Sequence, residues 1–102
     1  MLGKKELQKL IDKEEKTPEE MRMIGESYLR GDVLRDNTAA EAWLQKVIDS
    51  GDSKDSIIAM ILLMRGIYGI DNVISEKDYQ AMKEEEREKV KEMLDVIKGI
   101  FA

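Results

Sequence analysis

The stretch YLRGDVLRDNTAAEAWLQKVIDSG, residues 28–51, decides the fold because it alternates signals that end a helix with signals that start one. Gly31 closes a helix-like run at the position where a left-handed cap is preferred. After a short loop, Thr38 and Glu41 have the spacing of a capping box, which marks a helix start. The next helix is expected to stop at Gly51. Two helices joined by a loop are therefore predicted.

The same signals occur upstream of this stretch. Thr17, Pro18 and Glu20 form another capping-box start, with proline at the first helical position, so a helix is predicted over residues 18–30. Further upstream, apolar residues recur three and four apart, and they predict a charged, amphipathic helix over residues 4–15. Local signals for helix starts, helix ends and apolar helix faces are thus found throughout the first half of the chain.

The run Ile57–Met64 is apolar on all sides. A helix without a polar face is buried between neighbours, so the run predicts the centre of the domain, within a helix over residues 54–67. Asp52 or Ser53 is the expected cap of this helix.

The last quarter of the chain predicts one long helix over residues 76–98, started by Ser75. Its apolar stripe consists of Val90, Met93, Leu94, Ile97 and Phe101. The stripe has two interpretations: it folds back as a cap on the other helices, or it forms a seam with a second copy of the chain. A helix of about 34 Å exceeds what a small helical stack needs, which favours protrusion or self-association.

Composition excludes several classes of function. The chain has 102 residues, a net charge of −5 and neither cysteine nor histidine. Disulfides, thiolate metal sites and the commonest general base are therefore absent. The negative charge argues against binding to nucleic acid or anionic membranes. The charged N-terminal segment argues against a signal peptide, and no apolar run reaches the length of a membrane span, so a cytoplasmic location is expected.

No catalytic, cofactor or metal site is predicted. The carboxylates between Glu84 and Glu88 lack the apolar wall that would shift a pKa for acid–base catalysis. The acids within residues 49–55 lack the ligand spacing and the glycine of a calcium-binding loop. The chain is therefore expected not to be an enzyme, and to need no cofactor.

The chain also shows an internal repeat. A shift of about 38 residues places Gly31 on Gly69 and Ile24 on Leu62. The residues of the first copy resemble the Sel1-like repeat, a relative of the tetratricopeptide repeat. That resemblance is carried by Ile24-Gly25, Tyr28, Gly31, Val33, Asp36, Ala42-Trp43, Lys46 and Gly51. It is good over residues 18–53 and weak over residues 54–82. Ile24 replaces the family's leucine, and Glu41 stands where a lysine is usual.

What the resemblance implies is an all-α domain over residues 1–102. Two helical hairpins would form an α/α superhelix between an N-terminal helix and a long C-terminal helix. Such domains are protein-binding scaffolds, and the first helix of each hairpin tends to line the concave side. The implied function is a non-catalytic adaptor.

Several residues are candidate contacts for a partner protein. Arg22, Glu26 and Arg30 share one helix face, although a solvated face with a Glu26–Arg30 ion pair is the simpler interpretation. Arg65 interrupts an apolar segment and must reach the rim, an acidic partner or a group of carbonyls; a salt bridge is the favoured outcome. Tyr68 is either core edge or exposed contact.

Trp43 is expected in the core, since large aromatics dominate burial in small domains. Three hypotheses for the function remain open. The first is the adaptor. The second is a toxin-neutralising immunity protein, because a small acidic helical chain is steered toward basic toxins. The third is a structural homodimer formed through the C-terminal helix.

Overall fold

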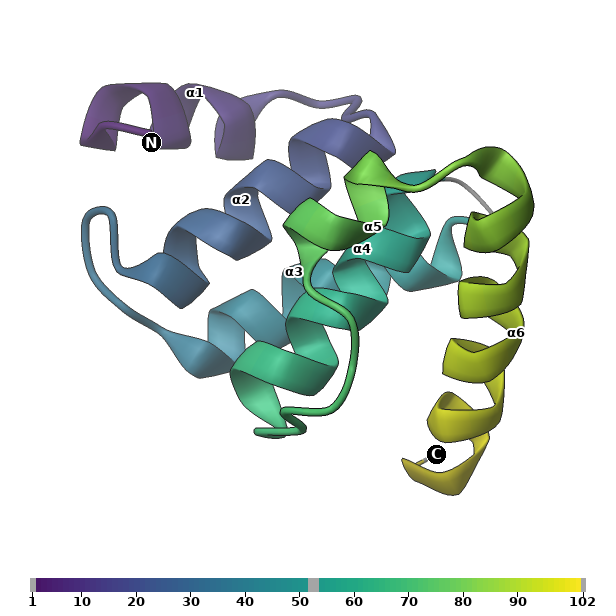
Figure 1. The fold of residues 1–102 in the computed structure, drawn as a ribbon. Coiled ribbons are helices and arrows are strands. Elements are labelled where there is room, and N and C mark those ends of the chain that lie inside the picture. Colours follow the sequence, from purple (N-terminus) through teal and green to yellow (C-terminus); the bar gives the residue numbers. More distant parts are fainter. Residues whose placement is uncertain (1, 52–53, 102) are drawn as a thin grey trace.

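The computed structural model describes residues 2–51 and 54–101, and only the backbone of Lys98 and Phe101. The described residues form six α-helices and one π-helical segment (Figure 1). In chain order these are α1 (Lys4–Asp12), α2 (Pro18–Arg30), α3 (Asn37–Asp49), α4 (Lys54–Leu62), η1 (Leu63–Ile67), α5 (Glu76–Ala81) and α6 (Glu84–Phe101). The predicted all-α class is confirmed.

Helix α2 begins and ends as the sequence predicts. The Thr17 hydroxyl accepts a hydrogen bond from the Glu20 amide at 3.1 Å, and the Glu20 carboxylate accepts one from the Thr17 amide at 2.9 Å. The hydrogen bond from the Lys13 ammonium, followed by the one from the Thr17 amide, lowers the pKa of Glu20 to about 2. At the other end, Gly31 takes a left-handed conformation with φ 73°. That conformation turns the chain toward α3.

The start of α3 differs from the prediction. The helix begins at Asn37, and the capping side chain is Asp36, whose carboxylate accepts from the Ala39 amide at 3.0 Å. Aspartate caps at least as well as threonine. The Asp36 amide also donates to the Tyr28 carbonyl at 3.1 Å, which ties the start of α3 to the end of α2. The predicted capping box at Thr38 is therefore wrong by two residues.

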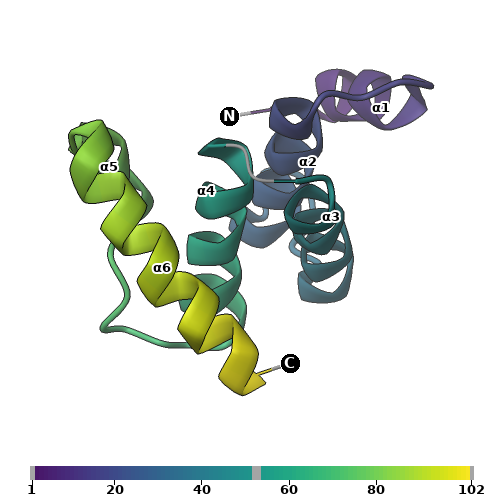
Figure 2. The ribbon, with the colours of Figure 1, turned by 90° about the vertical axis from the view of Figure 1, so that its right-hand side faces the viewer.

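Helix α4 occupies the centre of the molecule, as its apolar sequence predicts. Figure 2 shows α2 and α3 on one side of α4 and α5 and α6 on the other. Every residue from Ser56 to Ile61 is buried. Packing around them are Leu44, Val47, Ile48, Leu63, Met64, Val73, Tyr79 and Leu94. The expected cap of α4, Asp52 or Ser53, lies outside the described residues.

The chain continues from α4 into the π-helical segment η1. The Tyr68 amide donates to the Leu63 carbonyl at 3.0 Å, an i to i+5 bond. Gly66 lies in this wider turn, and a Cβ there would come within 2.6 Å of the Leu29 side chain on α2. The missing side chain thus lets α2 and η1 approach closely.

The predicted single C-terminal helix is wrong. Ser75 caps α5 as expected, but the helix ends at Ala81, and Met82 adopts an extended conformation with ψ 154°. The break allows two side chains far apart in sequence, Tyr79 at 4% and Leu94 at 1% exposure, to reach α4 together. The Arg87 side chain bonds the Tyr79 carbonyl at 3.3 Å and the Gln80 carbonyl at 2.8 Å, which satisfies the freed end of α5.

The helices pack as adjacent pairs. Helix α1 contacts α2, α2 contacts α3 and α4, and α4 carries α5 and α6 (Figures 1 and 2). Residues 54–101 differ from the first hairpin, because they contain the π-helical segment and the break at Met82. Across the residues that the structure describes, no helix is both long and apolar enough to span a membrane.

Candidate interaction surfaces

The predicted contact residues Arg22, Glu26 and Arg30 lie in an ion cluster between three helices. Arg22 pairs with Glu26, and its Nε atom lies 2.8 Å from a carboxylate oxygen of Asp55 on α4. Arg30 lies 2.9 Å from Glu26, which is the ion pair that the sequence predicts. Glu76 on α5 lies 3.6 Å from Arg22 and 3.8 Å from Arg30. The cluster therefore ties α2 to α4 and α5.

This cluster is partly buried, unlike the solvated face that was the simpler interpretation. The side chains of Arg22 and Glu26 are only 14% and 9% exposed, whereas Arg30 is 56% exposed. Three carboxylates share two guanidinium groups. Burial, followed by the charge of Glu26, raises the pKa of Glu76, although Arg22 and Arg30 act in the opposite direction. A contact between these residues and a partner stays a prediction.

Arg65 reaches a group of carbonyls, one of the three outcomes that the sequence allowed. Its Nη1 atom donates to the Asp71 carbonyl at 3.0 Å and also to the Val73 carbonyl. The favoured prediction of a salt bridge is wrong. Within the described residues, the Arg65 side chain bonds backbone carbonyls of the loop before α5. Tyr68 is 43% exposed, and its hydroxyl donates to the Glu41 carboxylate at 3.4 Å. Of its two interpretations, the exposed one fits this position.

The prediction that Trp43 belongs to the core is wrong. The indole is half-buried at the edge of α3, whose buried residues are Ala40, Leu44, Val47 and Ile48. The ammonium groups of Lys16 and Lys46 lie 5.5 and 5.3 Å from the ring centroid, within the range of cation–π attraction. Lys46 follows Trp43 by three residues, so this contact was visible as a helical spacing.

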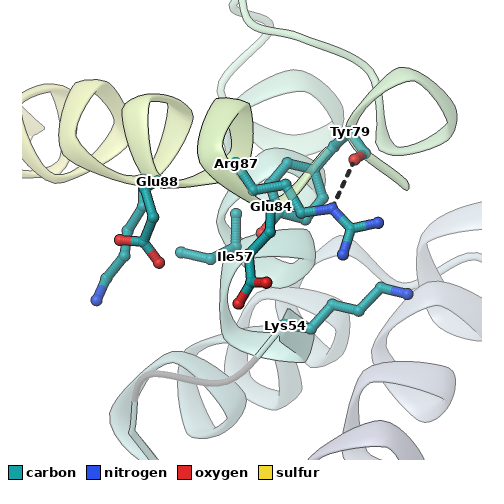
Figure 3. A pocket seen from close by; sticks show the side chains of 7 residues that line it. Lys54, Ile57, Tyr79, Glu84, Arg87 and Glu88 are labelled. Carbon is teal, nitrogen blue, oxygen red and sulfur yellow. Dashed lines mark hydrogen bonds between the residues drawn. The ribbon is translucent and has the colours of Figure 1, made fainter. Parts of the chain in front are cut away.

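A polar pocket of about 400 Å³ lies between α4, α5 and the start of α6 (Figure 3). It is lined by Lys54, Ile57, Tyr79, Glu84, Arg87, Glu88 and Lys91. The Arg87 guanidinium is already engaged, since it bonds the Tyr79 carbonyl and lies 5.6 Å from the Tyr79 ring. Besides Arg87, the lining carries two lysines and two glutamates, so neither sign of charge dominates the pocket. Within the described residues, no group of three acids could hold a metal ion.

The apolar stripe of α6 divides between the core and solvent. Leu94 is 1% exposed, and Val90 and Ile97 are half-buried against the core, as expected for a helix that folds back as a cap. Met93, however, is 62% exposed, as the seam interpretation requires. The side chain of Phe101 lies outside the described residues. The cap interpretation therefore holds for the buried part of the stripe, and a seam with a second copy stays a prediction.

Two further exposed apolar residues were missed in the sequence. Val96 is 67% and Ile100 is 73% exposed. Together with Met93 they are spaced i, i+3 and i+7, which places them on one side of α6. That spacing is present in the sequence, but spacing alone does not tell which side of the helix faces solvent. We call Met93, Val96 and Ile100 the outer stripe.

An apolar groove of about 380 Å³ runs beside the outer stripe. It lies between α6, Met82 and the loop before α5. Its lining residues are Asn72, Val73, Ile74, Met82, Val90, Met93, Leu94 and Ile97. Met93 belongs to both the groove and the outer stripe, so the two form one continuous apolar surface.

Compared with known protein families, with curated proteins and with solved structures, the chain shows no match. The findings describe an all-helical domain without identifying its family. The Sel1-like resemblance therefore rests on the residues of the first hairpin alone.

Proposed function

We propose that the chain is a non-catalytic protein-interaction module that docks a helical segment of another protein along α6. The observation that carries this proposal is the outer stripe, Met93, Val96 and Ile100, which is more than 60% exposed at each position. It adjoins an apolar groove of about 380 Å³. Contiguous apolar surface of this kind, when exposed, typically marks an interaction site.

The apolar arc of α6 is wider than the core needs. Successive residues are about 100° apart when α6 is viewed along its axis. The apolar residues between the directions of Val96 and Leu94 therefore cover about 160° of the helix circumference. A surface helix of a globular domain typically buries a stripe of about 100°. Helix α4 covers the Leu94 side of the arc, while the Val96 side faces solvent. A partner that covered this second side would gain the free energy of removing apolar surface from water.

The Sel1-like resemblance supports the same class of function but a different surface. It would place two hairpins in an α/α superhelix, and the partner would touch the concave face through Arg22, Glu26 and Arg30. The internal pairs of Arg22 and Glu26 favour α6 instead, because a partner would have to compete with Asp55 for the Arg22 guanidinium. The concave face is the alternative surface within this proposal.

Two other functions are compatible with particular observations. A structural homodimer would bury the outer stripe against its copy in a second chain. An immunity protein would use the net charge of −5 to attract a basic toxin. The adaptor and the immunity protein both need a different chain as partner, whereas the homodimer does not.

Site-specific photo-crosslinking in the source cells tests the proposal. A photoreactive amino acid is placed at Val96, at Arg30 on the alternative concave face or, as the control, at Leu34, which is 73% exposed but lies in the loop between α2 and α3. The expected result is a discrete product from Val96 whose crosslink maps to a helical segment of another protein. The product should disappear when Met93→Asp is added. Because Met93 is exposed, that variant should keep its stability within about 0.5 kcal/mol.

Other crosslinking results would reject the proposal. Products that contain only a second copy of the chain would establish the homodimer. Discrete products from position 30 but not from position 96 would move the docking site to the concave face. An identical pattern from positions 96 and 34 would mean that the outer stripe has no specific partner.

A further inference from the structure

Building on the proposed function, we infer that the docked segment is an amphipathic helix whose apolar face is bordered by lysine or arginine. The inference concerns the chemistry of the partner, and it rests on the charges that surround the outer stripe and the groove. Three exposed acids carry it: Glu92, Asp95 and Asp71.

Acidic side chains border the apolar surface on both sides. On α6, Glu92 lies one helical turn before Val96, so its carboxylate lies at the solvent edge of the outer stripe, and Asp95 lies one turn beyond Glu92 on the same acidic side of the helix. On the opposite side, Asp71 is exposed and directly precedes Asn72, which lines the groove. A segment lying on this surface would meet the negative charge of Glu92 along α6 and that of Asp71 at the loop, where the Arg65 guanidinium bonds the Asp71 carbonyl. Basic residues at those edges would complement it and speed association.

A helix fits the surface better than an extended peptide. Peptides that bind as strands need an unpaired sheet edge, and the described residues contain no strand. The groove instead lies between one helix and a loop, and the outer stripe repeats at helical spacing. An apolar helix face with anchors at i, i+3 or i+4, and i+7 could bury one anchor in the groove and others on the outer stripe.

A second copy of this chain is disfavoured as the occupant. Each copy carries a net charge of −5, so two copies repel each other. Around the outer stripe, each copy would also present Glu92 and Asp95 to a surface that is itself acidic. A partner of opposite charge gains attraction where a second copy meets repulsion.

The positive charge of Lys89 indicates which way round the partner helix would lie on the outer stripe. It is exposed and lies one helical turn before Met93, in line with the outer stripe. The partner helix should therefore carry its basic residues beside Glu92 and Asp95, and an acidic or neutral residue over Lys89. Its charges would thus be unevenly distributed along its length.

The test uses three synthetic peptides of equal length titrated into the full chain. The first is an amphipathic helix with leucine anchors and lysine edges. The second keeps the leucines but has glutamate edges, and the third scrambles the first so that no apolar face forms. Binding is measured by fluorescence anisotropy, and the location by NMR shifts of the Met93 methyl group. We expect the lysine-edged peptide to bind at least about tenfold more tightly than either control.

A charge-reversed chain, Glu92→Lys with Asp95→Lys, is the matched variant. Both positions are exposed, so circular dichroism should show an unchanged fold. The variant should prefer the glutamate-edged peptide, and added salt should weaken the preference in both chains.

The outcomes separate this inference from the proposed function. If the lysine-edged and glutamate-edged peptides bind α6 equally, the charge inference is overturned while docking along α6 survives. If no peptide shifts the Met93 methyl and crosslinking from Val96 also gives no partner, both proposals are wrong. Sedimentation that reveals a dimer burying Met93 would replace the basic helix with a second copy.

Discussion

The α2–α3–α4 part of the molecule and the α5–α6 part are packed very differently. In the first part, Ile24, Leu44 and Ile61 are completely buried. Gly25 lets α2 lie so close to α3 that an added Cβ would be 3.0 Å from the Leu44 side chain. In α6, by contrast, Leu94 alone is buried among the described side chains.

This difference shows how a small chain can combine a rigid core with an exposed apolar surface. Close packing in the first part supplies stability through many contacts per side chain. The second part is held by the Tyr79 and Leu94 anchors and by the Arg87 side chain at the break. Because few anchors are needed, other apolar residues of α6 stay exposed to solvent.

The largest expected effect comes from emptying a core position in each part. Ile61→Ala should lower the free energy of unfolding by about 3–4 kcal/mol, since the closely packed site cannot collapse. Leu94→Ala should cost less, about 2 kcal/mol, because the adjoining groove already leaves room for neighbours to move. Urea unfolding followed by circular dichroism measures both values. Equal losses would mean that α6 is packed as tightly as the core.

A smaller effect is expected from adding one methyl group to a glycine in each part. Gly25→Ala should destabilise the chain by about 1–3 kcal/mol, because the new Cβ would lie 3.0 Å from the Leu44 side chain, which is fully buried and has little room to shift. Gly99→Ala in α6 should stabilise it by about 0.5–1 kcal/mol, because nothing lies within 4 Å and alanine favours helix. Thermal unfolding of the two variants gives the sign directly. If Gly99→Ala instead destabilised the chain, residue 99 would make contacts that the open surroundings of this position exclude.

The third effect concerns the ion cluster that joins the two parts. The pKa of Glu76 is raised in the folded chain, so between the ordinary value of 4.5 and the raised value the folded state binds more protons than the unfolded state. Stability from this group is therefore present at acidic pH and is lost as pH rises through the raised pKa. Glu76→Gln removes that loss, so its stability relative to the wild type should increase from pH 4 to pH 7.

Denaturant unfolding at several pH values measures the effect of Glu76→Gln. The control is Glu85→Gln, which removes one negative charge from an exposed position on α6. A stability difference between Glu76→Gln and the wild type that decreases toward pH 7 would contradict the assigned direction of the pKa shift. A control that matches Glu76→Gln would attribute the trend to net charge instead of the cluster.

Much of the first part could be predicted because its signals are local. The capping box at Thr17, the left-handed Gly31 and the apolar run of α4 each act within a turn or two of helix. The candidate surfaces were harder to predict. Arg22, Glu26 and Arg30 share one helix face as predicted, but that face is partly buried, and the Asp55 partner of Arg22 is 33 residues away. Val96 and Ile100 had a visible spacing, yet spacing alone does not tell which side of a helix the core covers.

By itself, the sequence determined the all-α class, the ends of α2, the central position of α4 and the absence of cysteine and histidine chemistry. Only the tertiary structure decided the break at Met82, the half-buried position of Trp43 and the exposure of the outer stripe. Helix starts and stops depend on side chains and amides that are close in sequence. A break without glycine or proline, and the choice of buried face, depend on which helices meet, and those contacts join residues far apart along the chain.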